Sequence, residues 1–193
     1  QEGRCPAILR QTLTGYLSWQ ERNRVTVRQT IGSPRIAPQW VAALMAAGAT
    51  VSVEGDPAQE FPLAEWQPKK GRIAALHVPL GDVRLGEAHV GRTPADEPIV
   101  AAIAGVEMDG DRVAAARLFL TGVGPAPIWT AQAADRLRGR PLDETSIQAV
   151  AAAVEQEVAP QGDFRGSAEY RRAMAGVLTR RALLACLPQE VRA

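Results

Sequence analysis

The feature that most constrains the fold is a pair of long apolar runs separated by an Asp-Gly dipeptide. Residues 99–108 and 112–122 are both rich in Ala, Val, Ile and Leu, and Asp109-Gly110 lies between them. A tight primed turn needs positive φ at its central residues, which Asp-Gly supplies at little cost. The sequence therefore predicts a long antiparallel hairpin near the middle of the chain.

Three helical patterns follow this hairpin. Apolar residues at helical spacing predict helices over about 130–138, 143–158 and 167–187. Asp143 and Ser167 are suited to cap the second and third helices, because their side chains can accept from free amides of the first turn. The last of the three patterns ends at Pro188.

The last helix contains a charge within its apolar stripe. Its apolar positions are predicted to be Tyr170, Met174, Val177, Leu178, Leu184 and Ala185. Arg181 projects onto this stripe, so we expect it either to extend its charge to water or to pair with a carboxylate such as Asp163. Arg171, Arg172 and Arg180 are expected to be solvated.

The first part of the chain mixes helices and strands. We expect helices over 5–20 and 38–47, the second ended by Gly48, and strands or extended segments at 24–29, 50–53, 61–63 and 72–80. A turn or loop is expected at 30–34. The fold class is therefore predicted to be α+β, with an antiparallel sheet and a helical bundle after a smaller mixed half.

Composition excludes several classes of function. The net charge is +1 with no basic tract, so nucleic acid is not expected as a partner. We find no apolar run long enough to span a membrane. The two cysteines, Cys5 and Cys186, form no CxxC pair, and His77 and His89 lie in different segments, so no metal site is expected. Lone cysteines fit a reducing compartment, which predicts a cytoplasmic protein.

Several motifs occur in an order and spacing that resemble a known family. They are Arg92-Thr93-Pro94-Ala95-Asp96, Leu120-Thr121-Gly122-Val123-Gly124-Pro125-Ala126-Pro127, Leu137-Arg138-Gly139 and the run from Asp163 to Arg171. Together they resemble the FAD-binding (medium) subunit family of molybdenum hydroxylases, which includes the carbon monoxide dehydrogenase and xanthine dehydrogenase flavoproteins. Pro6-Ala7-Ile8-Leu9, Thr30-Ile31-Gly32 and Ala49-Thr50-Val51-Ser52-Val53 resemble the second part of that family's flavin domain.

The resemblance implies both an architecture and a function. Residues 1–87 would form the second half of an FAD-binding α/β domain, and residues 88–193 a carbon monoxide dehydrogenase flavoprotein C-terminal domain with an antiparallel sheet and a three-helix bundle. About the first third of a family member has no counterpart. The implied function is FAD-mediated electron transfer as an oxidoreductase component. The implied partners are a molybdenum-cofactor subunit, an iron–sulfur subunit and a polypeptide supplying the missing third.

The resemblance also implies contacts to the flavin. Thr30, Ile31 and Gly32 match the loop whose amides hold the diphosphate, while Asp96 and Trp129 are placed near the ring by position only. No catalytic residue is expected. Each residue also has a structural interpretation: an ordinary turn for Thr30 to Gly32, a turn cap for Asp96 and a packing residue at a helix start for Trp129.

The diphosphate loop departs from the family pattern. Ser33 replaces a glycine and Pro34 an asparagine, so the chain loses a position of close approach and a backbone N–H. We therefore predict that the isolated chain binds FAD weakly or not at all. The alternative function is a flavin-free scaffold or binding module that keeps the fold.

Overall fold

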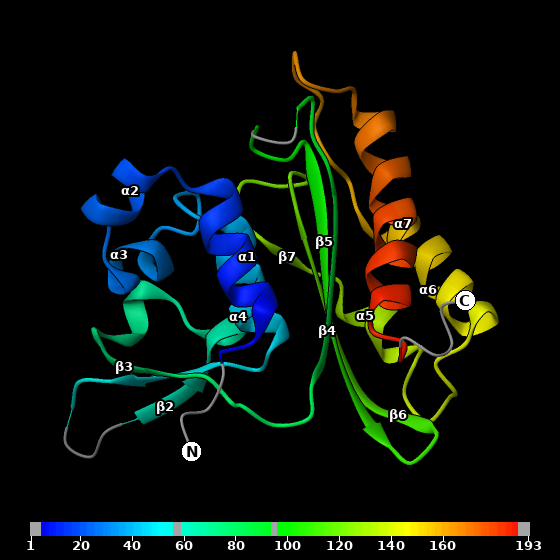
Figure 1. Cartoon of the computed structure of the whole chain (residues 1–193), viewed down its shortest axis with the longest axis horizontal. Helices are drawn as coiled ribbons and strands as arrows, with labels where there is room; N and C mark the ends of the chain where they lie inside the picture. Colours follow the sequence, from blue (N-terminus) through cyan, green and yellow to red (C-terminus); the bar gives the residue numbers. More distant parts are fainter. Residues whose placement is uncertain (1–4, 56–58, 94–95, 189–193) are drawn as a thin grey trace.

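The centre of the molecule is a four-stranded antiparallel sheet. The computed structural model describes residues 5–55, 59–93 and 96–188 (Figure 1). The strands are β4 (Arg84–Val90), β5 (Val100–Asp109), β6 (Arg112–Thr121) and β7 (Ile128–Trp129), in the order β4-β5-β6-β7. Helices α5 (Ala131–Asp135), α6 (Glu144–Glu157) and α7 (Ala168–Ala185) cover one face of this sheet.

The first half of the chain covers the opposite face. It contains α1 (Ala7–Tyr16), α2 (Trp19–Arg24), α3 (Val27–Gly32) and α4 (Pro38–Ala46). A small antiparallel sheet follows in the order β2-β1-β3, from β1 (Thr50–Val53), β2 (Gln59–Pro62) and β3 (Ile73–His77), with single turns of 3-10 helix at Leu63–Glu65 and Pro68–Lys70. Figure 1 shows this half to the left of the central sheet and the helical bundle to its right.

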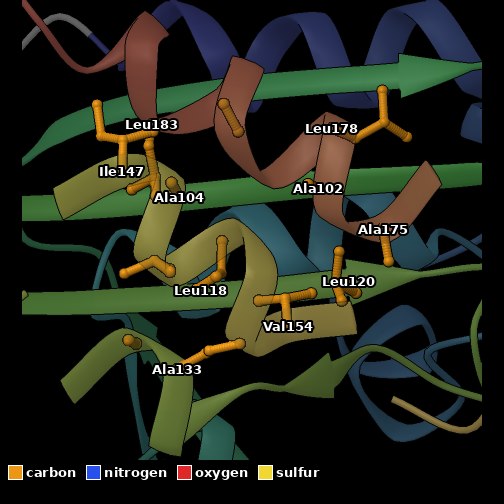
Figure 2. Packing of buried hydrophobic residues seen from close by; sticks show 14 of the residues in the cluster. Ala102, Ala104, Leu118, Leu120, Ala133, Ile147, Val154, Ala175, Leu178 and Leu183 are labelled. Carbon is orange, nitrogen blue, oxygen red and sulfur yellow. The ribbon is translucent and has the colours of Figure 1, made fainter. Parts of the chain in front are cut away.

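Strand β5 is buried on both faces. Its side chains point alternately to the two faces of the sheet, so the strand separates two hydrophobic cores. Ala102 and Ala104 face the bundle, where they join Leu118 and Leu120 of β6 (Figure 2). Ala101, Ile103 and Phe119 face the first half and join residues of α1, α4 and β1. Successive side chains of a strand point to opposite faces, so one strand serves both cores.

Two glycines let helices approach the sheet closely from opposite faces. A Cβ added at Gly105 would lie 2.0 Å from the Ala46 carbonyl oxygen of α4. A Cβ added at Gly86 would lie 2.0 Å from the Ala182 carbonyl oxygen of α7. Any other residue would place a Cβ where the helix backbone lies. Glycine at these two positions therefore determines how closely α4 and α7 pack on the sheet.

The structure confirms the predicted α+β class and the central hairpin. Strands β5 and β6 pair in antiparallel register from Ala101↔Thr121 to Asp109↔Arg112, with one irregularity between Glu107 and Met108. Gly110 in the turn has φ +61°. Asp143 and Ser167 cap α6 and α7 as expected, accepting from the amides of Ser146 and Tyr170.

The prediction of a strand at 24–29 is wrong. Residues 27–32 form α3, because Thr26 and Gln29 make a capping box in which each side chain bonds the other's backbone amide. A second capping box, Ser18 with Glu21, begins α2 and divides the helix expected over 5–20. The division of the chain at residue 87 falls inside β4 and stays a prediction.

The buried face of α7 also differs from the prediction. Tyr170 and Val177 are 39% and 38% exposed, and Arg181 is exposed. The buried residues of this helix are Arg171, Ala175, Gly176, Leu178, Thr179, Ala182 and Leu183. Close packing on β4 and α6 favours a helix face with small side chains. The buried face of α7 is therefore rotated away from the predicted stripe of bulky residues. Arg171, expected to be solvated, is the buried arginine.

Candidate functional site

The first half of the chain meets the central sheet along a seam that contains open space. A pocket of about 170 Å³, called the seam pocket here, is lined by Thr12, Tyr16, Leu17, Glu21, Arg35, Ile36, Ala37, Pro38, Gln39 and Glu97. A second hollow of about 270 Å³ shares Thr12 and Tyr16 with it and is completed by Gln11, Gly15, Glu87 and His89. The two spaces adjoin at Tyr16, between α1 and the sheet.

Polar contacts fix the walls of the seam pocket. Arg35 Nε donates to the Pro125 carbonyl at 3.1 Å, which joins the loop before α4 to the loop after β6. Glu97 Oε2 lies 3.2 Å from Arg165, which also donates to the Glu97 carbonyl. The pocket is therefore built from three segments that are far apart in the sequence.

Tyr16, Glu87 and His89 form a hydrogen-bonded cluster where the two hollows adjoin. Tyr16 Oη lies 3.0 Å from Glu87 Oε1 and 2.7 Å from His89 Nδ1. His89 Nδ1 lies 2.8 Å from the same Glu87 oxygen. Burial raises the pKa of the Tyr16 phenol, and the negative charge and hydrogen bond of Glu87 raise it further. Tyr16 is therefore a neutral donor at physiological pH and links α1 to β4.

Thr30, Ile31 and Gly32 lie at the end of α3 and not in an open loop. The Thr30 amide donates to the Thr26 carbonyl at 3.0 Å, and its hydroxyl donates to the Val27 carbonyl at 2.8 Å. Ile31 is 3% exposed and belongs to the core shared with α1 and α4. A Cβ added at Gly32 would meet nothing within 4 Å, so the packing of the chain does not require glycine there.

The residues after α3 offer few donors to a diphosphate. The Ser33 amide donates to the Gln29 carbonyl at 2.9 Å, and the Ile36 amide donates to the Ser33 carbonyl at 3.0 Å. Pro34 has no N–H. The carboxyl end of a helix also carries partial negative charge, which disfavours an anion. In this arrangement, the end of α3 does not fit the diphosphate of a flavin.

Asp96 lies in a loop, whereas Trp129 lies on the edge strand β7. Asp96 is exposed in the loop before β5, where its amide donates to the Thr93 carbonyl at 3.2 Å; Pro94 and Ala95 of the same motif lie outside the described residues. Trp129 is 44% exposed on β7 and stacks on Phe119 with ring centroids 6.1 Å apart. Within the described ranges, no hydrogen bond or ion pair joins Asp96, Trp129 and Thr30 to one another. Their roles as flavin contacts stay predictions.

The run from Asp163 to Arg171 builds a buried arginine clamp at the start of α7. Arg171 is 5% exposed and donates to the carbonyls of Ile99 (2.8 Å), Gly122 and Gly166 (3.4 Å). Its remaining terminal nitrogen lies 2.6 Å from Asp163 Oδ1. This hydrogen bond from Arg171, with others from the Arg165 and Gly166 amides, lowers the pKa of Asp163. Of the two alternatives for Arg181, the one in which its charge reaches water is correct, because Arg181 is exposed and Asp163 pairs with Arg171 instead.

Neither a membrane-spanning helix nor a cluster of three His, Cys, Asp or Glu metal ligands is found in the described part of the chain. Across residues 5–55, 59–93 and 96–188, none of the helices has the length and apolar character needed to cross a bilayer. In the same ranges, His, Cys, Asp and Glu side chains do not gather in threes as metal ligands.

Sequence reasoning missed Gln39, Tyr16 and the Glu87–His89 pair as parts of the seam. Glu87 and His89 had a usable signal, because residues two apart on a strand lie on the same face. Gln39 had none, since its burial depends on elements that pack against it in three dimensions.

Comparison with known proteins gives one consistent assignment. The family described as "CO dehydrogenase flavoprotein C-terminal domain" matches residues 88–186. The carbon monoxide dehydrogenase medium chain of Afipia carboxidovorans is 34% identical over 113 residues, which cover 58% of this chain and 39% of that protein. The medium chain of Hydrogenophaga pseudoflava is 36% identical over 74 residues, covering 38% of this chain and 26% of that one.

Solved structures extend the likeness to the first half of the chain. The Cu,Mo-CO dehydrogenase matches 97% of this chain and 68% of its own, with a TM-score of 0.74 and 27% identity. Quinoline 2-oxidoreductase from Pseudomonas putida 86 matches 98% of this chain and 69% of its own at a TM-score of 0.77, and at 22% identity this likeness concerns the fold alone. The sequence matches span about two fifths or less of the curated relatives. On this evidence, the chain belongs to the family of the CO dehydrogenase flavoprotein C-terminal domain.

Proposed function

We propose that this chain is a flavoprotein component of a molybdenum hydroxylase and takes part in FAD-mediated electron transfer. The observation that carries the proposal is the match of 97% of the chain to a CO dehydrogenase structure at 27% identity. The seam between the two halves supports it, because ligand sites are preferentially found where two packed units meet. A molybdenum-cofactor subunit and an iron–sulfur subunit are the proposed partners, and the cytoplasm is the proposed location.

FAD would supply the redox chemistry when bound, and the chain would supply position and surroundings. Asp96 and Trp129 remain the proposed contacts near the ring, and Thr30, Ile31 and Gly32 are the diphosphate contacts that the family resemblance implies. The occupied amides at Thr30, Ser33 and Ile36 oppose a diphosphate at the end of α3. Tight FAD binding would therefore need donors other than these amides, for example from a separate polypeptide corresponding to the family's first third.

The occupied amides also favour a second candidate function. A flavin-free scaffold would keep the sheet and the helical bundle and dock to the same partner subunits without binding the cofactor. Pro34 and the hydrogen-bonded end of α3 are the observations that support it. Both candidates predict association with partner subunits, and they differ in whether flavin is present.

A flavin titration separates the two functions. The purified chain is mixed with FAD and followed by flavin absorbance and fluorescence, with the double variant Ser33→Gly/Pro34→Asn beside it. We expect weak or absent binding by the native chain. If the end of α3 is a degraded diphosphate loop, the double variant should bind FAD about tenfold more tightly, because it regains a glycine and an amide donor.

Co-purification with the host's molybdenum-cofactor and iron–sulfur subunits completes the test. An assembly that contains flavin supports the electron-transfer component, and an assembly without flavin supports the scaffold. If the native chain associates with neither subunit, both candidates are wrong.

A further inference from the structure

Three donor atoms from α1 and β4 meet beside the hollow of about 270 Å³. Tyr16 Oη lies 3.0 Å from Glu87 Oε1 and 2.7 Å from His89 Nδ1, and His89 Nδ1 lies 2.8 Å from the same Glu87 oxygen. Each atom is therefore close to both of the others, and the three form a closed triangle. Glu87 and His89 are two apart on β4 and share one face of the strand, whereas Tyr16 is the last residue of α1.

This triangle contains fewer hydrogen atoms than contacts. With Glu87 ionised, the phenol of Tyr16 carries one hydrogen and Nδ1 of His89 carries at most one. Two hydrogen atoms cannot serve three separate contacts, so at least one pair of electronegative atoms lies at hydrogen-bond distance without a hydrogen of its own. Such a pair is repulsive, and a cation shared by all three atoms would replace the repulsion with attraction.

The separations between the three atoms fit one face of an octahedral coordination shell. With metal–ligand bonds of about 2.1 Å, neighbouring ligands lie about 3.0 Å apart in an octahedron and about 3.4 Å apart in a tetrahedron. The observed separations of 2.7, 2.8 and 3.0 Å are closer to the octahedral value. An ion on this face would keep three positions for water, and the adjoining hollow has room for several water molecules.

The chemistry of the donors selects the kind of ion. An imidazole nitrogen favours transition metals, whereas Mg²⁺ and Ca²⁺ take oxygen ligands. Glu87 supplies a negative charge, and its one ion-pair partner among the described residues is His89, so no lysine or arginine of that part neutralises it. Burial and Glu87 raise the pKa of the Tyr16 phenol. Coordination by the phenolate would therefore release a proton to water, and metal affinity should rise with pH.

We propose that Tyr16, Glu87 and His89 form a binding site for one divalent transition-metal ion, which would have three ligands from the chain and three from water. This site goes beyond the proposed electron-transfer function, because it needs neither flavin nor a partner subunit. Sequence patterns do not indicate it, since Tyr16 and Glu87 are 71 residues apart and one of the three ligands is a phenol.

Calorimetric titration of the metal-free chain with NiCl₂, in the absence of flavin, tests this site. Ni²⁺ is the probe because it binds nitrogen and oxygen ligands tightly, and its absorption spectrum distinguishes six-coordinate from four-coordinate complexes. We expect one ion per chain. His89→Ala removes a ligand and should raise the Kd by about tenfold or more. His77→Ala is the matched control, because His77 is the other histidine of the chain and contacts Ser52 at 2.8 Å instead. The control should bind Ni²⁺ as the native chain does.

Two further variants keep the test decisive if His89→Ala does not fold. Glu87→Gln preserves the shape of the side chain and removes its charge, so the Kd should again rise by about tenfold or more. Between about pH 7.5 and 8.5 an ordinary histidine is already neutral, so a continued rise of native affinity in this range reports the proton lost by Tyr16. Tyr16→Phe should abolish that rise. Absence of saturable Ni²⁺ binding, a four-coordinate spectrum, or equal binding by the native chain and the Glu87 and His89 variants would overturn the proposal.

Discussion

On each face of the central sheet, an arginine donates to backbone carbonyl oxygen. Arg171 on the bundle face contacts the carbonyls of Ile99, Gly122 and Gly166 and is 5% exposed. Arg117 on the opposite face donates to the Ala46 carbonyl at the end of α4 and pairs with Glu107, with 24% of its side chain exposed. The arginine on the bundle face is therefore much less exposed than the arginine on the opposite face, although both contact backbone carbonyls.

This difference separates a buried structural contact from a contact that water can reach. Arg171 on the bundle side is almost fully buried, and its charge is satisfied within the chain, as a permanent structural contact requires. The side of the first half has Gln39 and Arg35 at the seam pocket. Both sides contain open space, because Arg171 and Asp163 also line a hollow of about 570 Å³.

The largest expected effect is the loss of the buried clamp. Arg171→Met should lower the free energy of unfolding by about 3–5 kcal/mol, because three carbonyls and Asp163 lose a buried charged donor. Arg117→Met should cost about 1 kcal/mol, since water can reach that site. Urea denaturation of both variants measures the difference. Equal losses would show that the two faces are not distinct in this respect.

Smaller effects are expected at the two close-contact glycines. Gly105→Ala and Gly86→Ala should each cost about 1–3 kcal/mol, because the added methyl group forces a helix away from the sheet. Gly81→Ala is the control, since a Cβ there meets nothing within 4 Å. Thermal unfolding of the three variants gives the comparison. If Gly105→Ala lowers the melting temperature much less than Gly86→Ala, α4 can move away from the sheet more easily than α7. That result would sharpen the contrast between the two faces.

The smallest expected effect is a dependence on pH that belongs to the bundle face alone. The Arg171 hydrogen bond lowers the pKa of Asp163 from 3.8, so its contribution to stability is complete above about pH 4. That contribution is lost as the pH falls through the folded-state pKa. The stability advantage of the native chain over Asp163→Asn should therefore shrink as the pH falls below about 4. A constant difference in urea unfolding across this range would contradict the assignment.

Local signals predicted the fold where local chemistry decides the structure. The Asp109-Gly110 turn and the caps at Asp143 and Ser167 act through their own neighbours, and all three were confirmed. The strand expected at 24–29 failed because the Thr26 and Gln29 capping box is a local helix signal that outweighed alternation. The rotation of α7 was not predictable in the same way, since contact with Gly86 selects small residues such as Ala182 for the buried face.

The candidate site was less accessible to sequence reasoning. The resemblance directed attention to Thr30, Ile31 and Gly32, whereas the residues that line the seam pocket lie a few positions later, at the start of α4. A glutamine in an apolar helix shows no sign in the sequence that it will be buried next to a pocket. Its surroundings depend on α1 and on Glu97 of the loop before β5, which only the tertiary structure brings to it.

The sharing of β5 between two cores has a thermodynamic consequence. Ala102 and Ala104 belong to one core while Ala101 and Ile103 belong to the other, so neither core can lose this strand and leave the other intact. The two halves should consequently melt in one cooperative transition, although they differ in architecture. A ligand that occupies the seam would then raise the melting temperature of the helical bundle that it never touches.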